Sequence, residues 1–239
     1  KIYAKSIEGI RYVYCSTLNK SIKGYTVIKI IYVYGNDIYN LEDIIWDKDE
    51  GTKNEIVRKK LKEYYEKGLD PEIVLFDLWY AASETFNLLN DFNWKYLCLT
   101  KRNRHLNGKR VDEHKYYGGK SLYGRAKGIG HIVQVAKHCK RYIITNLETH
   151  IMSHTGWMRY TERWIIETVF RDLKLFLHFE HCEARSLKAQ KNHIALCMNA
   201  YLFLKKKNPN KSIEASQRDF LQDFYMKKFK NQDVFELVA

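Results

Sequence analysis

The side chains with the clearest chemical potential lie in one stretch, residues 160–174. If this stretch is a helix, Arg163, Glu167, Arg171 and Lys174 follow each other at steps of four, four and three residues. Such spacing sets one carboxylate among three cations on a single stripe. A stripe of this kind is also typical of an exposed, salt-bridged helix face. The charges alone therefore leave both interpretations open.

The residues around this stripe favour a packed helix. Its opposite face is apolar enough to pack on a sheet, and consists of Trp164, Ile165, Val169, Leu173 and Phe176. A second carboxylate, Asp77, closes the short apolar run 73–76, which is typical of a strand buried on both faces. Open α/β sheets bind ligands outside the carboxyl ends of their strands. We therefore predict that Asp77 faces a ligand crevice.

Two acids among several cations suit the chemistry of phosphodiesters. Mg²⁺ prefers carboxylate, water and phosphate oxygens, and two such ions about 4 Å apart stabilise both the attacking and the leaving oxygen. The cations beside Glu167 would hold the nucleic acid backbone. Other chemistries lack support: His114 replaces the first glycine that a phosphate-binding loop ending at Ser121 requires, and the His/Cys pairs lack structural-zinc spacing.

Composition restricts the class of protein. The chain has 239 residues, with 41 Lys plus Arg against 28 Asp plus Glu, a net charge of +13. Such a charge attracts nucleic acid or an anionic membrane surface, although translation of an AT-rich genome also yields many lysines. Hydrophobic residues make up 45% and only two prolines occur, which excludes a disordered chain. Without a long apolar run or a C-x-x-C pair, we expect a cytoplasmic protein with reduced thiols and no membrane partner.

The order of elements predicts one α/β catalytic domain with a mixed sheet flanked by helices. A hairpin of strands 10–15 and 25–34, connected through 20–24, precedes an acidic loop. A capping box at Thr52 and Glu55 begins the first helix. The later predicted elements are strand 73–76, helix 83–89, strands 95–100, 131–136 and 141–146, and helices 157–177 and 187–204.

The spacing Tyr160, Arg163, Glu167 and Lys174, with two, three and six residues between them, resembles the Y-R-E-K signature of the insertion-sequence-four group of DDE transposases. Residues 74–81 resemble the second-aspartate motif of that family, in which an aromatic residue follows the acid by three positions. The likeness covers about residues 1–205 and leaves 206–239 as a charged, helical tail. It implies a ribonuclease-H-like fold with a β-rich insertion, about 91–150, before the last catalytic helix.

The resemblance assigns roles to particular residues. It implies that Asp77 and Glu167 are the second and third catalytic, metal-binding acids, with Mg²⁺ as cofactor and Mn²⁺ as a substitute. It implies that Tyr160, Arg163 and Lys174 contact DNA near the terminal phosphates of the element. Further candidates for DNA contact are Arg171, Trp79, Lys101, Arg102 and Arg104, although a tryptophan beside a buried strand also suits a core.

The first catalytic aspartate of the family would precede the segment 1–3, because the acids at 37, 43, 47 and 49 come too late in the order. We therefore interpret the chain as the carboxyl-terminal part of a bacterial, nucleoid-associated transposase. Such an enzyme would hydrolyse double-stranded DNA at element ends and transfer the freed strand to target DNA, as a homodimer in a synaptic complex. One alternative is an inactive, truncated remnant that binds DNA or interferes with full-length subunits. Another is a basic structural protein that binds RNA.

Overall fold

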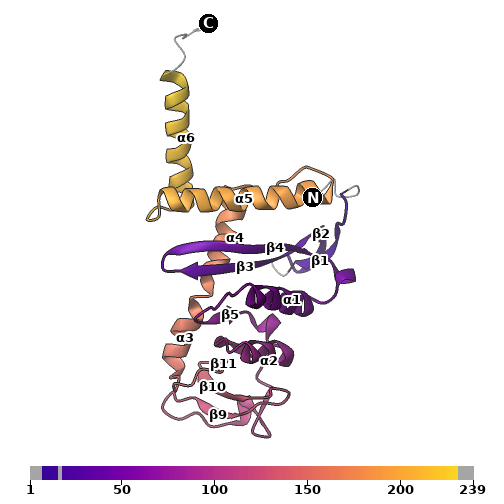
Figure 1. The fold of residues 1–239 in the computed structure, drawn as a ribbon, viewed down its shortest axis with the longest axis vertical. Coiled ribbons are helices and arrows are strands. Elements are labelled where there is room, and N and C mark those ends of the chain that lie inside the picture. Colours follow the sequence, from indigo (N-terminus) through magenta and orange to yellow (C-terminus); the bar gives the residue numbers. More distant parts are fainter. Residues whose placement is uncertain (1–6, 16–17, 231–239) are drawn as a thin grey trace. The chain divides into compact units, whose positions relative to one another are not determined.

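The computed structural model describes residues 7–15 and 18–230, which belong to two compact units. The continuous unit is Lys48–Ile165, and the discontinuous unit joins Lys1–Asp47 to Ile166–Ala239. Figure 1 labels the helices and strands of both units. Within the described ranges, none of the helices is both long enough and apolar enough to cross a bilayer.

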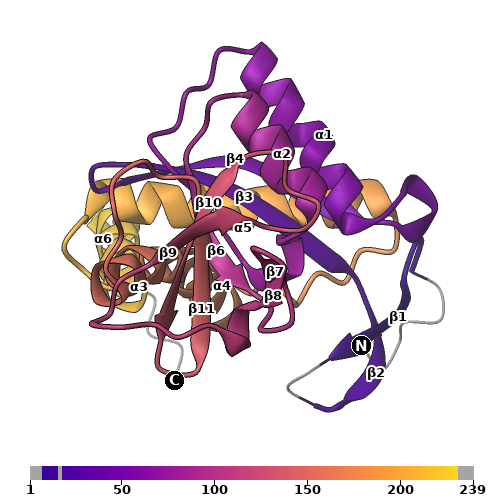
Figure 2. The same ribbon diagram turned by 90° about the horizontal axis from the view of Figure 1, so that it is seen from below.

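A mixed five-stranded sheet forms the centre of the continuous unit. Its strand order is β5 (Val74–Phe76), β6 (Tyr96–Thr100), β11 (Arg141–Thr145), β10 (Ile132–His138) and β9 (Leu122–Arg125). Strands β5 and β6 run parallel, and the other neighbours are antiparallel. The four strands other than β5 all come from the predicted β-rich insertion, 91–150, and form one sheet with β5; Figure 2 shows β9, β10 and β11. The prediction of an α/β fold with a mixed sheet is confirmed.

Three helices belong to this unit: α1 (Lys53–Glu66), α2 (Ser83–Asp91) and α3 (Ser153–Thr161). The predicted capping box is present, because the Thr52 hydroxyl accepts a hydrogen bond from the Glu55 amide and the Glu55 carboxylate accepts one from the Thr52 amide. The short elements are η2 (Lys48–Glu50), η3 (Leu78–Tyr80), β7 (His105–Leu106), β8 (Lys109–Arg110) and η4 (Val111–Glu113). Leu97 of β6, Val135 of β10 and Ile143 of β11 are completely buried, which places the core at the sheet.

The strand pairing of the discontinuous unit differs from the prediction. Strand β1 (Arg11–Cys15) pairs with β2 (Lys20–Gly24), the segment predicted as a connection. Strand β3 (Thr26–Tyr34) pairs with β4 (Asp37–Trp46), which lies in the predicted acidic loop. The reason is the two-residue turn Gly35-Asn36, in which Gly35 has a φ of 59°. A glycine with positive φ at this position gives a turn whose twist matches that of paired strands. A hairpin therefore forms here although β4 contains several acidic residues.

The predicted single helix 157–177 is also wrong. Helix α3 ends at Thr161, and α4 (Trp164–Phe176) begins three residues later. Around the break, the Glu162 and Arg163 amides bond to carbonyls only three residues back, at 3.2 and 3.1 Å. The Thr161 hydroxyl donates to the Met158 carbonyl at 2.6 Å and so competes for a helical acceptor. The tightened turn places the Y-R-E-K residues on two helices and the turn between them.

The discontinuous unit contains two further helices, α5 (Leu187–Lys207) and α6 (Ile213–Lys230), as predicted for the second apolar helix and the charged tail. It also buries an ion pair between Lys29 of β3 and Asp43 of β4. Asn40 accepts from the Lys29 ammonium at 3.1 Å and donates to the Asp43 carboxylate at 2.7 Å. Burial lowers the pKa of Lys29, while the hydrogen bond to Asp43 opposes that shift.

We expect Asp43→Ala to lower the free energy of unfolding by about 3 kcal/mol or more, because it leaves the Lys29 ammonium buried without its counter-charge. The double change Lys29→Met with Asp43→Leu should cost less, since it removes both charges. Urea unfolding measures both effects. Asp37→Ala, at an exposed end of the same hairpin, is the matched control and should change stability by less than about 0.5 kcal/mol. Equal effects of Asp43→Ala and Asp37→Ala would contradict the analysis.

Candidate active site

Asp77 directly follows β5, at the carboxyl end of the strand, as the sequence predicts. It is the residue before the 3₁₀ turn η3, and its carbonyl accepts from the Tyr80 amide at 2.9 Å. In the described structure its side chain does not cap that turn, and the residue is exposed. Strand β5 is half-buried rather than buried on both faces, because it forms one edge of the sheet. The carboxylate is therefore accessible from solvent.

Arg104 holds the segment that follows Asp77. Its Nε donates to Thr100 Oγ1 at 2.9 Å, its Nη1 to Ser83 Oγ at 3.3 Å and its Nη2 to the Ala81 carbonyl at 2.7 Å. The guanidinium carbon also lies 5.2 Å from the ring centroid of Phe86, and burial lowers the pKa of Arg104. All three guanidinium nitrogens thus connect the end of β6 to the segment after Asp77. Nothing in the sequence separates this arginine from its basic neighbours.

Tyr160, in the continuous unit, lies close enough to both Arg163 and Asp77 for their charges to shift its pKa. Tyr160 on α3 is 3% exposed, and the Arg163 guanidinium carbon lies 5.4 Å from its ring centroid. Burial raises the pKa of Tyr160, Arg163 lowers it and Asp77 raises it further. Within the described part of the chain, the buried Tyr160 hydroxyl has no hydrogen-bond partner. Buried hydroxyls without a partner are uncommon in proteins, and the neighbouring Arg163 side chain is the polar group that lowers the pKa of Tyr160.

Trp79 belongs to the surface rather than to the core. Its side chain is 67% exposed, two residues after Asp77. The Lys53 ammonium lies 5.3 Å from its ring centroid, and Asn54 Nδ2 donates to its carbonyl at 3.4 Å. Burial lowers the pKa of Lys53. An exposed indole beside an ammonium is a suitable surface for stacking a base.

The basic segment after β6 is partly exposed. Lys101 and Arg102 are exposed, whereas Arg104 is half-buried by the contacts described above. The Arg110 side chain pairs with Asp112 through two hydrogen bonds of 3.0 and 2.7 Å. Lys101 and Arg102 are consequently better placed than Arg104 or Arg110 to meet a phosphate.

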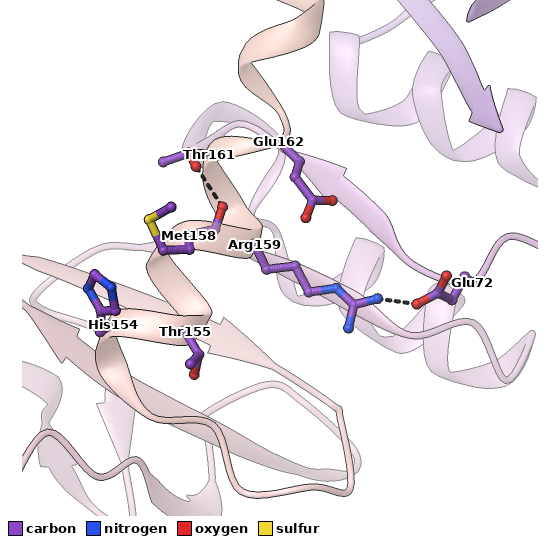
Figure 3. A pocket seen from close by; sticks show the side chains of 7 residues that line it. All are labelled: Glu72, His154, Thr155, Met158, Arg159, Thr161 and Glu162. Carbon is purple, nitrogen blue, oxygen red and sulfur yellow. Dashed lines mark hydrogen bonds and ion pairs between the residues drawn. The ribbon is translucent and has the colours of Figure 1, made fainter. Parts of the chain in front are cut away.

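The pocket in Figure 3 lies along α3 and includes neighbours of the signature residues. Its lining residues are Glu72, His154, Thr155, Met158, Arg159, Thr161 and Glu162. Arg159 pairs across this pocket with Glu72, two residues before β5. The ion pair connects the helix that carries Tyr160 to the start of the strand that ends before Asp77. Sequence reasoning missed this contact because 87 positions separate its partners.

Glu167, Arg171 and Lys174 lie on α4 in the discontinuous unit. Glu167 is half-buried in the first turn, where the helix dipole stabilises a carboxylate. Arg171 pairs with the adjacent Asp172 at 3.2 Å, and Lys174 pairs with Glu180 at 2.7 Å. Two of the three cations of the predicted stripe, Arg171 and Lys174, therefore have acidic partners of their own.

Two features of α4 differ from the expected pattern. Val169 and Leu173 are completely buried, as predicted, but Trp164 is 59% exposed because it begins the helix after the break. Asp172, which the sequence analysis did not single out, is 6% exposed. Burial, and then the Asp172 charge, raise the pKa of Tyr201 to about 12. Asp172 is one acid among neighbouring charged residues, and no spacing in the sequence marks it as buried.

The predicted site residues thus divide between the two units. The continuous unit holds Asp77, Trp79, Lys101, Arg102, Arg104, Tyr160 and Arg163, and the discontinuous unit holds Glu167, Arg171 and Lys174. Among residues 7–15 and 18–230, no group of three or more His, Cys, Asp or Glu side chains is placed to hold a metal ion. Of the signature, Tyr160 and Arg163 share a neighbourhood with Asp77.

An α/β protein with an exposed acid at a strand end, a coupled Tyr-Arg pair and a high positive charge belongs to a class suited to phosphate-ester chemistry on nucleic acid. Residues 51–203 match the family model described as Transposase DDE domain. Because the match spans more than half of the chain, the protein belongs to the DDE transposase family. No curated protein matches the chain. The family suggests DNA as substrate and transposition as function.

We expect Arg104→Ala to lower the free energy of unfolding by about 2–3 kcal/mol, because it removes three hydrogen bonds from a charged donor. Arg104→Lys should recover only part of this loss, since an ammonium cannot reproduce the planar fork. The measurement is denaturant unfolding of each variant. Arg102→Ala, at an exposed neighbour, is the control and should stay within about 0.5 kcal/mol of the parent protein. Similar losses for Arg104→Ala and Arg102→Ala would contradict the role described here.

Proposed function

We propose that this protein is the catalytic part of a DNA transposase with a ribonuclease-H-like fold. It would hydrolyse a phosphodiester at each end of an insertion sequence and transfer the freed 3′ hydroxyl to target DNA. The observation that carries the proposal is the match to the transposase family, together with the exposed acid at the end of β5. The position of Tyr160 beside Arg163, with the Asp77 charge raising its pKa, supports it further.

We assign Asp77 and Glu167 as the carboxylates that hold Mg²⁺, or Mn²⁺ in its place. Their oxygen atoms are the donors that such hard cations prefer. The accessible Asp77 side chain, which does not cap the following turn, fits this role. When bound, the metal would stabilise charge on the phosphate and lower the pKa of an attacking water. Arg104 then acts as a positioning residue, because it fixes the backbone that follows Asp77.

The cations of the signature would position DNA rather than carry out the reaction. Arg163 and Lys174 would contact backbone phosphates, with Arg171 beside them. Lys174 and Arg171 already pair with acids, so phosphate would compete with Glu180 and Asp172 for them. Tyr160 would contribute its buried hydroxyl as a donor to the same backbone. These contacts are independent of sequence and would set the register of the element end.

Outside the signature, a stacking surface and a basic segment would extend the contact. The exposed Trp79 ring, next to the Lys53 ammonium, suits a base that leaves the duplex at the reaction point. Lys101 and Arg102 would meet the backbone nearby. Synapsis of two element ends would require at least two subunits, so we propose a homodimer as the functional state.

A second candidate is an inactive remnant that binds DNA or interferes with full-length subunits. One observation favours it. The acid that precedes the first strand pair, Glu8, accepts a hydrogen bond from the Leu187 amide at 2.9 Å, and its carboxylate is thus engaged in a structural contact. A remnant would retain DNA binding without cleavage. An upstream coding sequence with an in-frame aspartate on a strand would favour the enzyme, and a stop codon would favour the remnant.

If the proposal holds, a longer protein that also includes the first aspartate, expected upstream of residues 1–3, should nick DNA that carries the element ends only when Mg²⁺ or Mn²⁺ is present. Asp77→Asn and Glu167→Gln should each reduce the nicking rate at least about 100-fold, because each removes a carboxylate ligand. A gel assay of supercoiled plasmid measures this rate, and EDTA should abolish it. Glu66→Gln, an exposed acid at the end of α1, is the control and should nick normally. Normal nicking by either ligand variant would refute the assignment, and DNA binding without nicking by the parent protein would favour the remnant.

DNA affinity should depend on salt through the proposed phosphate contacts. We expect Lys174→Ala and Lys101→Ala to weaken binding and to reduce the slope of log K against log salt by about 1 each. Trp79→Ala should weaken binding about tenfold with little change in that slope, since stacking releases no counterion. Fluorescence anisotropy over a salt series measures all three. Lys140→Ala, an exposed cation in the turn after β10, serves as the control. Equal slopes for Lys174→Ala, Lys101→Ala and Lys140→Ala would speak against a defined DNA path.

A further inference from the structure

Strands β1 and β2 form a two-stranded ribbon in the discontinuous unit, drawn at the lower right of Figure 2. In its register, Tyr12 lies opposite Lys23 and Tyr14 lies opposite Ser21. Opposed residues share one face of a sheet, and so do residues two apart on a strand. These four residues therefore form one face of the ribbon, which we name the tyrosine face. Tyr12 is 72% exposed and Tyr14 is 66% exposed.

The two faces of the ribbon differ in exposure. Val13 and Ile22 oppose each other on the other face, and both are half-buried. The ribbon thus turns its aliphatic residues toward cover and its two tyrosines toward solvent. Adjacent large rings on one exposed face are more than the scattered apolar residues that every surface has, and mark a binding surface.

The base of the ribbon is fixed to the rest of its unit. The Arg11 guanidinium pairs with Asp47, directly after β4, at 2.8 Å. The Glu8 amide donates to the Arg185 carbonyl at 2.9 Å, and the Glu8 carboxylate accepts from the Leu187 amide at 2.9 Å. These contacts join the ribbon to the end of β4 and to the start of α5. The tyrosine face is therefore held in place before any ligand arrives.

Local contacts also restrict both rings. The Tyr14 hydroxyl donates a hydrogen bond to the Asn19 side chain. The Lys23 ammonium lies 5.5 Å from the ring centroid of Tyr12. Side chains that are already restricted lose less conformational entropy when a ligand packs against them.

The charge of this part of the chain favours an anionic ligand. The sequence contains no Asp or Glu in residues 9–36. The cations in the same range are Arg11, Lys20, Lys23 and Lys29. Because Arg11 and Lys29 pair with acids elsewhere in the unit, Lys20 and Lys23 give the ribbon its net positive charge. Exposed aromatic rings among cations are the surface that nucleic acid strands bind.

The spacing of the rings favours a single strand over a duplex. Two residues along a β-strand advance by about 7 Å. This is about twice the 3.4 Å rise per nucleotide of a stacked strand. A strand that contacts both rings must therefore open its own base stack. Bases in a duplex are already stacked and paired, so unpaired bases are the ones that can lie on the tyrosines.

We propose that the tyrosine face binds single-stranded DNA, with one base on each tyrosine ring and the Lys20 and Lys23 ammonium groups near its phosphates. The choice of DNA over RNA rests on the transposase family of the chain. The proposal goes beyond the DNA contacts assigned above, because the tyrosine face contains none of the signature residues and neither of the metal-binding acids. It assigns a separate site to an unpaired strand.

The test is fluorescence anisotropy of the full chain, without divalent metal, with a labelled thymidine oligomer of about 15 nucleotides. Tyr12→Ala and Tyr14→Ala should each weaken binding about fivefold or more, because each removes a stacking ring. Tyr12→Phe keeps the ring and should bind within about twofold of the parent protein. Lys23→Ala should reduce the slope of log K against log salt by about 0.7, the value for one phosphate contact on a single strand.

Tyr117→Ala is the matched control, because Tyr117 is 71% exposed and lies outside the ribbon. It should leave the affinity for the oligomer unchanged. Cross-linking then locates the site. When iodouracil replaces thymine, irradiation should attach the oligomer to the tryptic peptide 12–20, which contains both tyrosines of the face. Circular dichroism of each variant checks that the fold is retained.

Unchanged affinity in both Tyr12→Ala and Tyr14→Ala would overturn the proposal, and so would cross-links that lie only outside residues 12–20. A duplex weakened to the same extent by these two changes would also overturn it. So would a matched RNA oligomer that binds more tightly than DNA and depends on the same tyrosines. Absence of metal-dependent nicking, with single-strand binding intact, would instead count only against the proposed function.

Discussion

The guanidinium of Arg104 fixes the backbone that follows Asp77, the exposed acid at the end of β5. Strand β5 is only three residues long and lies at a sheet edge, so its parallel pairing with β6 gives limited support to the backbone that follows it. Arg104 supplies the remaining support, because it joins Thr100 at the end of β6 to Ala81 and Ser83. The ion pair of Arg159 with Glu72 supports the other end of the same strand. The accessible carboxylate of Asp77 thus depends chiefly on Arg104, a half-buried cation that the fold itself holds in place.

The break between α3 and α4 has a comparable effect on the signature. A continuous helix would align Arg163 with Glu167, Arg171 and Lys174, whereas the turn at 162–163 leaves Arg163 beside the ring of Tyr160. The pKa of Tyr160 is therefore influenced by Arg163 and by the charge of Asp77. The four signature residues consequently lie on α3, in the turn after it and on α4.

The sequence predicts local elements well wherever a specific signal exists. Thr52 and Glu55 form the capping box, Asp77 ends a strand, and the helices that became α2 and α5 lie where expected. The failures have physical causes. Strand β4 carries acids that suggested a loop, but Gly35 closes a hairpin that pairs it with β3. Thr161 ends a helix without glycine or proline, and Arg104 is distinguished only by tertiary contacts.

The division of the chain into a continuous and a discontinuous unit determines the order in which the two can be completed on the ribosome. Residues 48–165 are consecutive, so this unit can fold as soon as it leaves the exit tunnel. Strands β3 and β4 emerge earlier, but the Lys29 ammonium also contacts the Met198 sulfur at 3.4 Å, 169 positions later. At a translation rate of about 5–20 residues per second, roughly ten seconds or more pass between the synthesis of Lys29 and that of Met198. The β3–β4 hairpin therefore reaches its native burial only after α5 has been made, although it is translated earlier than α5.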